Sequence, residues 1–374
     1  MTETLAVTPL FAEHEALGAR FVPYAGWRMP VQYRGVTEEH HAVRRAVGLF
    51  DVSHMGRLLF RGPRALEVIG AAISNDLSRL VPGQALYTCC CNEQGGILDD
   101  LIVYRLPASG QGERVLVVCN AANHSKIAPH LSQLARGRAE FEDLSPSTSL
   151  IAVQGPRALE LLAALGVEGD SPASLPAFHV RETRAMGIAC SIARTGYTGE
   201  DGVEVVVQNA DAPAFWRGLI ERGKSLGVEA IGLAARDTLR LEARLSLYGN
   251  EIDETTNPFE AGLGWTVKLE GRDFIGKAAL AELARAPRSR QIVGFEMVGR
   301  GIARHGYPII GAGGEPLGVV TSGAPSPTLG KSIGLGYVPL AHAALGSELL
   351  IDCRGRTIPA RVVKTPFYRR ASRG

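Results

Sequence analysis

The stretch "ALYTCCCNEQGGILDDLIVYRL", residues 85–106, predicts a β-hairpin that carries two adjacent carboxylates. An apolar run, an Asn-Glu-Gln-Gly-Gly turn and a second apolar run are typical of two paired strands. Asp99 and Asp100 stand where the second strand begins. Because neighbouring strand residues point to opposite faces, these two carboxylates cannot form an acid–base pair on one surface. We expect one to cap the turn and face water, and the other to face inward, where a buried carboxylate needs a partner such as a substrate.

The sequence on either side places this hairpin in an α+β unit. Gly56 begins an alternating strand, a helix follows from Pro63, and residues 113–135 predict another strand and another helix. The resulting order over residues 57–135 is strand–helix–strand–strand–helix. That order predicts a ferredoxin-like unit, in which two helices cover one face of an antiparallel sheet.

The remaining chain shows a repeated motif and a change of composition. "GPRALE" occurs at residues 62–67 and 155–160, each time after a predicted strand and before a predicted helix, which hints at an internal duplication. Residues 179–208 predict two strands joined by "GYTGEDG". Residues 290–366 are rich in glycine, proline and short β-type runs, with turn signals roughly every ten residues. They predict a small all-β domain that begins near residue 285.

Composition and charge limit the class of protein. The chain has 374 residues, of which 45% are hydrophobic and 21% charged. These values are ordinary for a globular protein, and the length allows two or three domains. The net charge of +2 gives no reason to expect a nucleic-acid or membrane partner. Of the 40 basic residues only six are lysines, so arginine, the better bidentate binder of carboxylates and phosphates, dominates.

The cysteines and the N-terminal segment indicate the cellular compartment in which the protein is expected. Cys89, Cys90 and Cys91 are consecutive, so they cannot all reach one metal ion, and the chain has no C-x-x-C pair. We expect buried free thiols in a reducing cytosol and no metal site. The segment "MTETLAVTPLF" lacks the pattern of a signal peptide, and no apolar run reaches about 18 residues. The sequence therefore predicts a cytoplasmic protein with no membrane association.

A second segment places an acid inside an apolar strand. "RTGYTGEDGVEVVV", residues 194–207, is too acidic for a phosphate loop and continues into a strand rather than a helix. It therefore predicts a hairpin turn, which accounts for its glycines. A hairpin does not account for Glu204, which stands among four valines.

The helix predicted in "AARDTLRLEARL", residues 234–245, carries several charges. Arg236 and Arg240 are four residues apart and share one face of it. The acids Asp237 and Glu242 lie off that face. We expect an ordinary solvated helix surface.

Two other motifs have simple explanations. His54, in "DVSHM", stands near Asp51, but no serine or cysteine nucleophile motif accompanies them, so we expect His54 to be structural. The glycine-rich "GAGGEPLG", residues 311–318, lies between predicted strands. We expect a turn there rather than a nucleotide site.

Side by side, seven segments resemble the aminomethyltransferase (T-protein) family of the glycine cleavage system. They follow one another in the family's order along nearly the whole chain: "TPLFAEHEALGARFVPYAGWRMPVQY", "GLFDVSHMG", "GGILDDLIVY", "RTGYTGEDGVE", "GLAARDTLRLEARLSLYGNEIDE", "FIGKAAL" and "GVVTSGAPSPTLGKSIGLGYV". Each segment alone is modest evidence. Their order and spacing together make the resemblance specific.

The resemblance implies an α+β fold of three domains around a central hole that holds folate. The ferredoxin-like segment and a C-terminal all-β barrel or jelly-roll-like domain agree with it. We expect residues 1–55 together with 140–284 to form the N-terminal folate-binding domain. Residues 56–139 would be the ferredoxin-like domain and residues 285–374 the C-terminal β domain. The idea of an internal duplication gains no support from the family.

The resemblance also implies a transfer that depends on tetrahydrofolate. In this family an aminomethyl group arrives on the lipoyl arm of the carrier H-protein, and tetrahydrofolate takes the one-carbon unit. The products are 5,10-methylenetetrahydrofolate, ammonia and the dihydrolipoyl carrier. We therefore expect tetrahydrofolate as co-substrate and lipoylated H-protein as partner.

The family pattern implies roles for individual residues. Asp100 would face the folate and be the catalytic residue, orienting tetrahydrofolate, favouring proton loss and stabilising positive charge on the one-carbon unit. Asp99 would then be the turn residue. Glu204 matches the acid that binds the pterin ring, whose N–H groups suit a carboxylate. The other positions that match folate- or substrate-binding residues are Tyr197, Met55, Arg236, Arg369, Tyr87, Tyr104 and Asn120.

Three other functions stay open at this point. Related folate-binding proteins linked to iron–sulfur assembly and tRNA modification carry a Lys-Gly-Cys-Tyr-type signature where this chain has "RTGYTGEDG". Folate domains fused to flavin-dependent sarcosine or dimethylglycine dehydrogenases need a flavin domain, for which this chain has no room. The third alternative is a folate-binding module without catalysis, and the retention of Asp100 argues against it.

Overall fold

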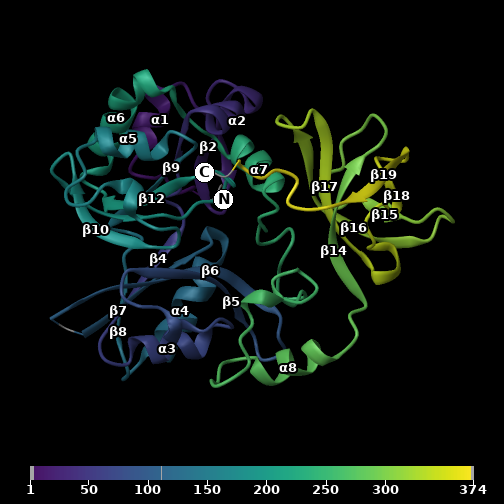
Figure 1. Cartoon of the computed structure of the whole chain (residues 1–374), viewed down its shortest axis with the longest axis horizontal. Coiled ribbons are helices and arrows are strands. Elements are labelled where there is room, and N and C mark those ends of the chain that lie inside the picture. Colours follow the sequence, from purple (N-terminus) through teal and green to yellow (C-terminus); the bar gives the residue numbers. More distant parts are fainter. Residues whose placement is uncertain (1–3, 111, 372–374) are drawn as a thin grey trace. The chain divides into compact units, whose positions relative to one another are not determined.

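The computed structural model describes residues 4–110 and 112–371. The chain forms two compact units, whose elements are labelled in Figure 1. The first comprises Met1–Ala72, Asp76–Thr88 and Leu101–Arg236, and the second comprises Ile73–Asn75, Cys89–Asp100 and Asp237–Gly374.

The first unit contains a six-stranded sheet in the order β10-β11-β12-β9-β3-β13. Its strands are β3 (Val47–Asp51), β9 (Thr148–Gln154), β10 (Val180–Ala185), β11 (Ile188–Ala193), β12 (Gly202–Gln208) and β13 (Val228–Ala230). The β3–β13 pair is parallel and the other neighbours are antiparallel. Near its N-terminus the unit also has α1 (Phe11–Ala16), the hairpin β1 (Arg20–Tyr24) and β2 (Trp27–Gln32), and α2 (Val36–Arg45).

The prediction of two strands over residues 179–208 is wrong, because the structure has three. The first predicted strand is broken by a two-residue turn at Met186 and Gly187, both with positive φ, so that β10 and β11 pair as a hairpin. Two successive residues with positive φ match the right-handed twist of the flanking strands. The sequence contains little sign of this turn, because methionine rarely adopts a positive φ.

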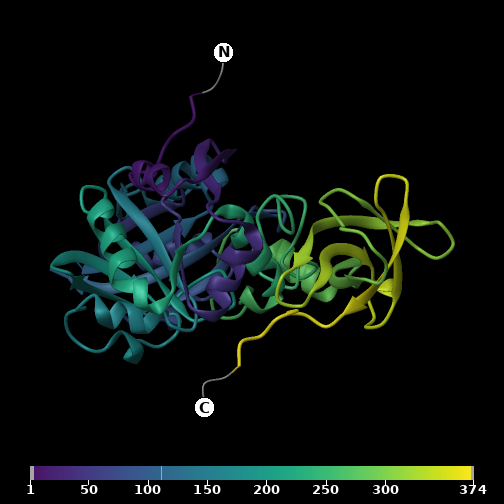
Figure 2. The same ribbon diagram turned by 90° about the horizontal axis from the view of Figure 1, so that it is seen from above.

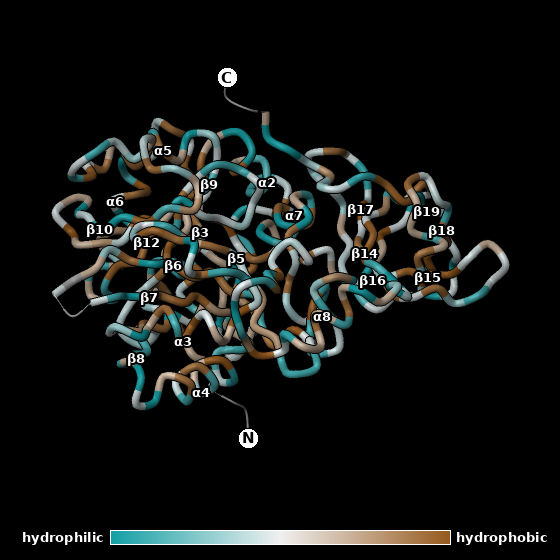
Figure 3. Tube along the Cα trace, turned by 60° about the horizontal axis from the view of Figure 1, so that its bottom comes forward, coloured by the Kyte–Doolittle hydropathy of each residue, from teal (hydrophilic) through white to brown (hydrophobic). Residues whose placement is uncertain are grey.

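One face of this sheet is buried under helices. Val203, Val205 and Val207 alternate along β12 and are at most 2% exposed. They belong to one hydrophobic core with α5 (Ala158–Ala164) and α6 (Ala212–Gly223). Figure 1 shows both helices beside the sheet, and Figure 3 shows hydrophobic stretches along the strands. Burying each such side chain stabilises the fold by about 1.5–3 kcal/mol, and the alternation turns the residues between them to the opposite face.

The predicted hairpin lies in a five-stranded antiparallel sheet, ordered β5-β6-β7-β4-β8. Its elements are β4 (Gly56–Arg61), α3 (Ala65–Ala72), β5 (Gln84–Cys91), β6 (Ile97–Ser109), β7 (Gly112–Cys119), α4 (His124–Ala135) and β8 (Glu140–Asp143). Four strands in the order β8-β4-β7-β6, with α3 and α4, have the β-α-β-β-α-β connectivity of the predicted ferredoxin-like segment. The strand β5 is an addition at the edge.

The two "GPRALE" segments share a local turn. Gly62 follows β4 and Gly155 follows β9, both with positive φ, and each leads into a helix. At Gly155 a Cβ atom would lie 2.4 Å from the carbonyl oxygen of Ala46, so only glycine fits. The two sheets differ in strand number and order, so the repeat describes one kind of strand-to-helix connection.

The second unit contains a closed six-stranded barrel in the order β14-β17-β16-β15-β18-β19. Its strands are β14 (Arg290–Met297), β15 (Pro308–Ile310), β16 (Pro316–Ser326), β17 (Lys331–Pro339), β18 (Glu348–Asp352) and β19 (Thr357–Val363). Figure 2 shows them in yellow-green and yellow. The prediction of a C-terminal all-β barrel is confirmed, and "GAGGEPLG" is the turn between β15 and β16. Two helices precede the barrel, α7 (Leu233–Glu242) and α8 (Lys277–Arg285).

The boundaries expected between three domains remain a prediction, although the chain has three separate larger sheets. In the described part of the chain, no helix has the length and apolar character needed to cross a lipid bilayer.

Candidate functional site

The loop between β11 and β12 closes a hairpin, as its sequence predicts. Arg194 and Asp201 form an ion pair at 2.7 Å across its base. Glu200 pairs with Arg44 at 3.0 Å, and both of these side chains are buried. At Gly196 a Cβ atom would lie 2.0 Å from the side-chain oxygen of Gln154, so any other residue there would have to displace the Gln154 amide. The acids of the loop are therefore used within the protein.

Glu204 lies on the face of β12 opposite the buried valines. In the sheet it is flanked by Ala193 and Ala152, and its side chain is half-buried. The hydroxyl of Thr195 donates a hydrogen bond to Oε2 of Glu204 at 2.5 Å. The hydroxyl oxygen of Tyr104, from β6, lies 3.1 Å from that of Thr195. The acid inside this apolar strand thus has a dedicated hydroxyl donor, Thr195.

The neighbouring charge keeps Tyr104 protonated. Burial and the negative charge of Glu204 raise the pKa of the Tyr104 phenol well above its usual range, outweighing the lowering by the hydrogen bond with Thr195. An ionised phenolate would place a second negative charge beside the carboxylate. Tyr104 therefore acts as a neutral hydroxyl group at any physiological pH.

Arg236 and Tyr197 form a stacked pair near this hairpin. The guanidinium carbon of Arg236, in the first turn of α7, lies 4.6 Å from the centroid of the Tyr197 ring. Both side chains are half-buried. A guanidinium over an aromatic ring is attracted by the electron density of the ring face. The pair offers a flat cationic surface suited to an aromatic or anionic ligand.

His54 is a neutral histidine close to Arg236. Burial, followed by the positive charge of Arg236, lowers the pKa of His54 to about 3. Its ring makes an edge contact with Tyr24, with centroids 5.7 Å apart. Among the described residues, the buried Nδ1 atom of His54 has no hydrogen-bond partner. The structural role expected for His54 remains a prediction.

The turn that carries Met55 is held by two buried charges. Arg57 is 0% exposed and donates to the carbonyl oxygens of Ser53 and Met55. Asp51 accepts hydrogen bonds from Thr8, His14 and the backbone of Ser53. Burial alone would raise the pKa of Asp51, but these bonds and the charge of His14 lower it to about 2. The half-buried Met55 therefore has a fixed backbone.

Asn120 and Tyr87 are both half-buried. Asn120 follows the end of β7, and Tyr87 lies within β5. Gly56 pairs with Cys119, so Met55 and Asn120 are the residues immediately beyond that pair. At Gly56 a Cβ atom would lie 2.4 Å from the sulfur of Cys119, which explains the glycine.

In the second unit, the structure reverses the expected exposure of the two aspartates. Asp99 is 0% exposed, whereas Asp100 is half-buried. The prediction that Asp99 caps the turn and faces water is wrong, because β6 begins at Ile97 and contains both aspartates. The turn is capped instead by Asn92, whose side-chain oxygen accepts hydrogen bonds from two backbone N–H groups of the turn.

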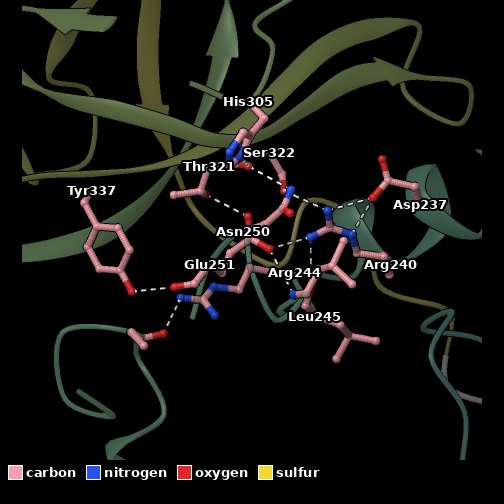
Figure 4. A network of polar contacts seen from close by, with 12 residues as sticks. Asp237, Arg240, Arg244, Leu245, Asn250, Glu251, His305, Thr321, Ser322 and Tyr337 are labelled. Carbon is pink, nitrogen blue, oxygen red and sulfur yellow. Dashed lines mark hydrogen bonds and ion pairs between the residues drawn. The ribbon is translucent and has the colours of Figure 1, made fainter. Parts of the chain in front are cut away.

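The solvated helix surface expected for α7 is also wrong for two of its charges. Arg240 is 1% exposed and pairs with Asp237 at 2.7 Å and with Glu251 at 2.6 Å. It also donates to the hydroxyl of Ser322 at 2.7 Å. Figure 4 shows this network between α7, the loop around Glu251 and β16. The helix buries this face because a barrel strand packs on it, which no local pattern in the helix reveals.

Glu242 and the C-terminal segment complete the anchoring of α7. Glu242 is fully buried and accepts hydrogen bonds from Ser326 and from Thr328. The backbone N–H of Tyr368 donates to the carbonyl oxygen of Glu242 at 2.9 Å. This bond holds the backbone of Tyr368. Arg369 is the next residue, and its side chain is exposed.

All six cysteines are free thiols. Burial raises the pKa of Cys89 far above its usual range, so its thiol is inert as a nucleophile.

Comparisons with known proteins agree over the whole chain. Residues 10–271 match the model of the GCVT N-terminal domain, and residues 290–369 match that of the glycine cleavage T-protein C-terminal barrel domain. The chain is 49% identical to an aminomethyltransferase of Saccharopolyspora erythraea, with 97% of this chain and 98% of that protein covered. It is 50% identical to an aminomethyltransferase of Rubrobacter xylanophilus, with 98% and 95% covered.

A solved structure agrees as well. The glycine cleavage system aminomethyltransferase T of Bartonella henselae matches with a TM-score of 0.90 and 39% identity, covering 98% of each chain. The match includes the mixed helix-and-sheet architecture and the C-terminal barrel. The chain therefore belongs to the aminomethyltransferase (T-protein) family of the glycine cleavage system and is an enzyme of that class.

Proposed function

We propose that this enzyme transfers a one-carbon unit to tetrahydrofolate from an aminomethyl group carried on the lipoyl arm of H-protein. The products would be 5,10-methylenetetrahydrofolate, ammonia and dihydrolipoyl H-protein. The observation that carries the folate proposal is the Glu204 carboxylate, which a hydroxyl group orients on a half-buried strand face. The amino and ring N–H groups of a pterin are the donors that such a carboxylate would bind.

The residues of the first unit fit a folate in their chemistry. Glu204 would bind the pterin ring, and the stacked Tyr197 and Arg236 would contact a flat or anionic part of the molecule. Met55, with its fixed backbone, would supply an apolar contact. Further contacts are proposed for Tyr87, Tyr104 and Asn120. Tetrahydrofolate itself supplies the two amine nitrogens that receive the one-carbon unit.

Asp100 is the proposed catalytic residue. Its half-buried carboxylate would orient the attacking amine and accept a proton as ammonia leaves. The same negative charge would stabilise positive charge on the one-carbon unit during the transfer. Arg369, which is exposed in the C-terminal segment, would bind an anionic group of a substrate.

We also propose a cytoplasmic location and three domains. Six free thiols are typical of a reducing compartment. The domains would be residues 1–55 with 140–284, residues 56–139 and residues 285–374. The strand β8 (Glu140–Asp143) pairs with β4 of the ferredoxin-like segment, so that sheet extends past the expected boundary at residue 139.

The decisive experiment supplies the purified enzyme with tetrahydrofolate and aminomethyl-loaded H-protein and measures methylenetetrahydrofolate and ammonia. Equal amounts of both products are expected. A folate-binding module without catalysis would bind tetrahydrofolate but form neither product. Formation of product with free aminomethyl-dihydrolipoamide but not with loaded H-protein would reject the carrier protein as partner.

A further inference from the structure

The protons around Glu204 can be assigned from the geometry. The Thr195 hydroxyl has one hydrogen, and it is donated to Oε2 of Glu204. An ionised carboxylate has no proton to return. The hydrogen bond between Thr195 and Tyr104, at 3.1 Å, must therefore be donated by the Tyr104 phenol. The direction is Tyr104 to Thr195 to Glu204.

We propose that Tyr104 and Thr195 form a hydroxyl relay that holds the Glu204 carboxylate in its ligand-binding orientation. Both are positioning residues, and neither needs to touch the ligand through its hydroxyl group. This inference rests on the proposed role of Glu204 in binding the pterin ring. It adds Thr195, which no sequence motif singled out, and gives the Tyr104 hydroxyl a task other than direct contact.

Burial supports the relay over an incidental contact. Tyr104 is 4% exposed and Thr195 is 8% exposed, so water cannot easily replace either hydroxyl. Glu204 itself is half-buried and keeps further lone pairs for a ligand. A relay of this kind polarises each successive hydrogen bond and so strengthens the last one.

The backbone holds the relay in place. Thr195 lies just after β11 and its carbonyl oxygen accepts a hydrogen bond from Gln154 at 3.1 Å. The same side chain of Gln154 also donates to the carbonyl oxygen of Val203, beside Glu204. The loop and the strand are thus fixed to one amide, which leaves the carboxylate torsions as the freedom that the relay removes.

The test is a double-mutant cycle on tetrahydrofolate affinity, measured by titration calorimetry. Thr195→Val removes the hydroxyl at nearly constant shape, and Thr195→Ser retains it. We expect Thr195→Val to weaken binding about fivefold or more and Thr195→Ser to restore most of the affinity. In the Glu204→Gln background, Thr195→Val should have little further effect, because the relay acts through the carboxylate.

The control is Thr198→Val in the same loop. Thr198 is also buried, but its hydroxyl donates to Gln154 at 3.0 Å rather than to Glu204. We expect Thr198→Val to lower stability while its effect on affinity stays additive with Glu204→Gln. Tyr104→Phe, which keeps the ring, serves as a second relay variant if Thr195→Val does not fold.

The possible failures are distinguishable. Wild-type affinity in Thr195→Val and Tyr104→Phe, with Glu204→Gln weakened, would overturn the relay but leave the role of Glu204 intact. Wild-type affinity in Glu204→Gln would overturn the proposed pterin-binding role and the relay together. Additive effects of Thr195→Val and Glu204→Gln would show that Thr195 acts independently of the carboxylate, which also overturns the relay.

Discussion

Arg240 and Glu251 form an ion pair at 2.6 Å in which neither side chain is more than 1% exposed. Both oxygens of Glu251 are used, because Oε1 accepts a hydrogen bond from Thr321 and Oε2 accepts one from the backbone of Leu247. Removing one partner of such a pair leaves a buried charge without compensation. Substituting one residue of this pair therefore tests whether the pair anchors α7 to the barrel.

We expect Arg240→Met to lower the free energy of unfolding by about 3–5 kcal/mol, since Glu251 would remain charged and buried. The control is Lys331→Met, which breaks a pair with Glu296 on the surface at 2.9 Å. Exposed pairs contribute about 0–1 kcal/mol, so this change should be small. Urea unfolding of both variants measures the difference. Equal losses would contradict the anchoring role of Arg240.

Asp100→Asn is expected to lower kcat by roughly 100-fold or more, because the amide cannot accept a proton. The affinity for tetrahydrofolate should change less. Asp99→Asn provides the contrast: Asp99 is fully buried, so we expect a lower melting temperature with kcat per folded enzyme largely retained. Steady-state kinetics with loaded H-protein, corrected for the folded fraction, separates the two. A larger loss of kcat in Asp99→Asn than in Asp100→Asn would show that Asp100 is not the catalytic aspartate.

Tyr197→Leu removes the ring that Arg236 covers at 4.6 Å. The lost attraction is about 0.5–2 kcal/mol, so the KM for tetrahydrofolate should rise about 2- to 30-fold. Tyr197→Phe retains the ring and should stay near the wild-type value. If Tyr197→Phe were as impaired as Tyr197→Leu, the phenol hydroxyl and not the stacked ring would be the important group.

The lowered pKa of His54 predicts that the folded enzyme loses stability as the pH falls. In the folded enzyme burial and Arg236 lower the pKa of His54 to about 3, whereas the unfolded chain protonates near its ordinary value of 6.5. The unfolded state therefore binds more protons between these two values, and stability falls as the pH drops from about 6.5 to 3. The slope attributable to one such group is about 1.4 kcal/mol per pH unit.

His54→Asn is the corresponding variant, and its stability should depend less on pH between 6.5 and 4. Asp51 is an acid, and its pKa is also lowered in the folded enzyme, to about 2. Its ionised carboxylate therefore stabilises the folded state above pH 3.8. That contribution is lost only as the pH falls from about 3.8 to 2. Thermal unfolding at a series of pH values should therefore show Asp51→Asn less stable than wild type above pH 3.8, with the difference shrinking only at the acid end. Identical profiles for wild type and His54→Asn would show that His54 takes up its proton at the same pH in the folded and unfolded states.

The broad architecture was predictable from the sequence because it depends on patterns local to each segment. The hairpin at residues 85–106, the ferredoxin-like order of elements and the C-terminal barrel each follow from strand periodicity and turn residues. The family followed from seven ordered motifs. Glu204 was recognised as exceptional because an acid interrupts a run of valines, a signal visible without any tertiary contact.

The errors have a common cause, which is that burial is a property of what packs on a residue. The periodicity of α7 gave no sign that Arg240 and Glu242 are covered, because the buried partners Glu251 and Thr328 lie 11 and 86 residues away along the chain. The turn at Met186 was missed because neighbouring strands, not the preference of methionine, impose its backbone conformation.

Sequence alone determined the residue types available for chemistry, the strand alternation that sets Glu204 apart from the buried valines, and the family. Tertiary structure alone decided that Asp99 rather than Asp100 is fully buried, since that depends on where β6 begins and which of its faces is covered. It also brought Tyr104 to Thr195, 91 residues away in sequence. A hydrogen bond between distant segments needs both backbones fixed in space, and only the packed sheets supply that constraint.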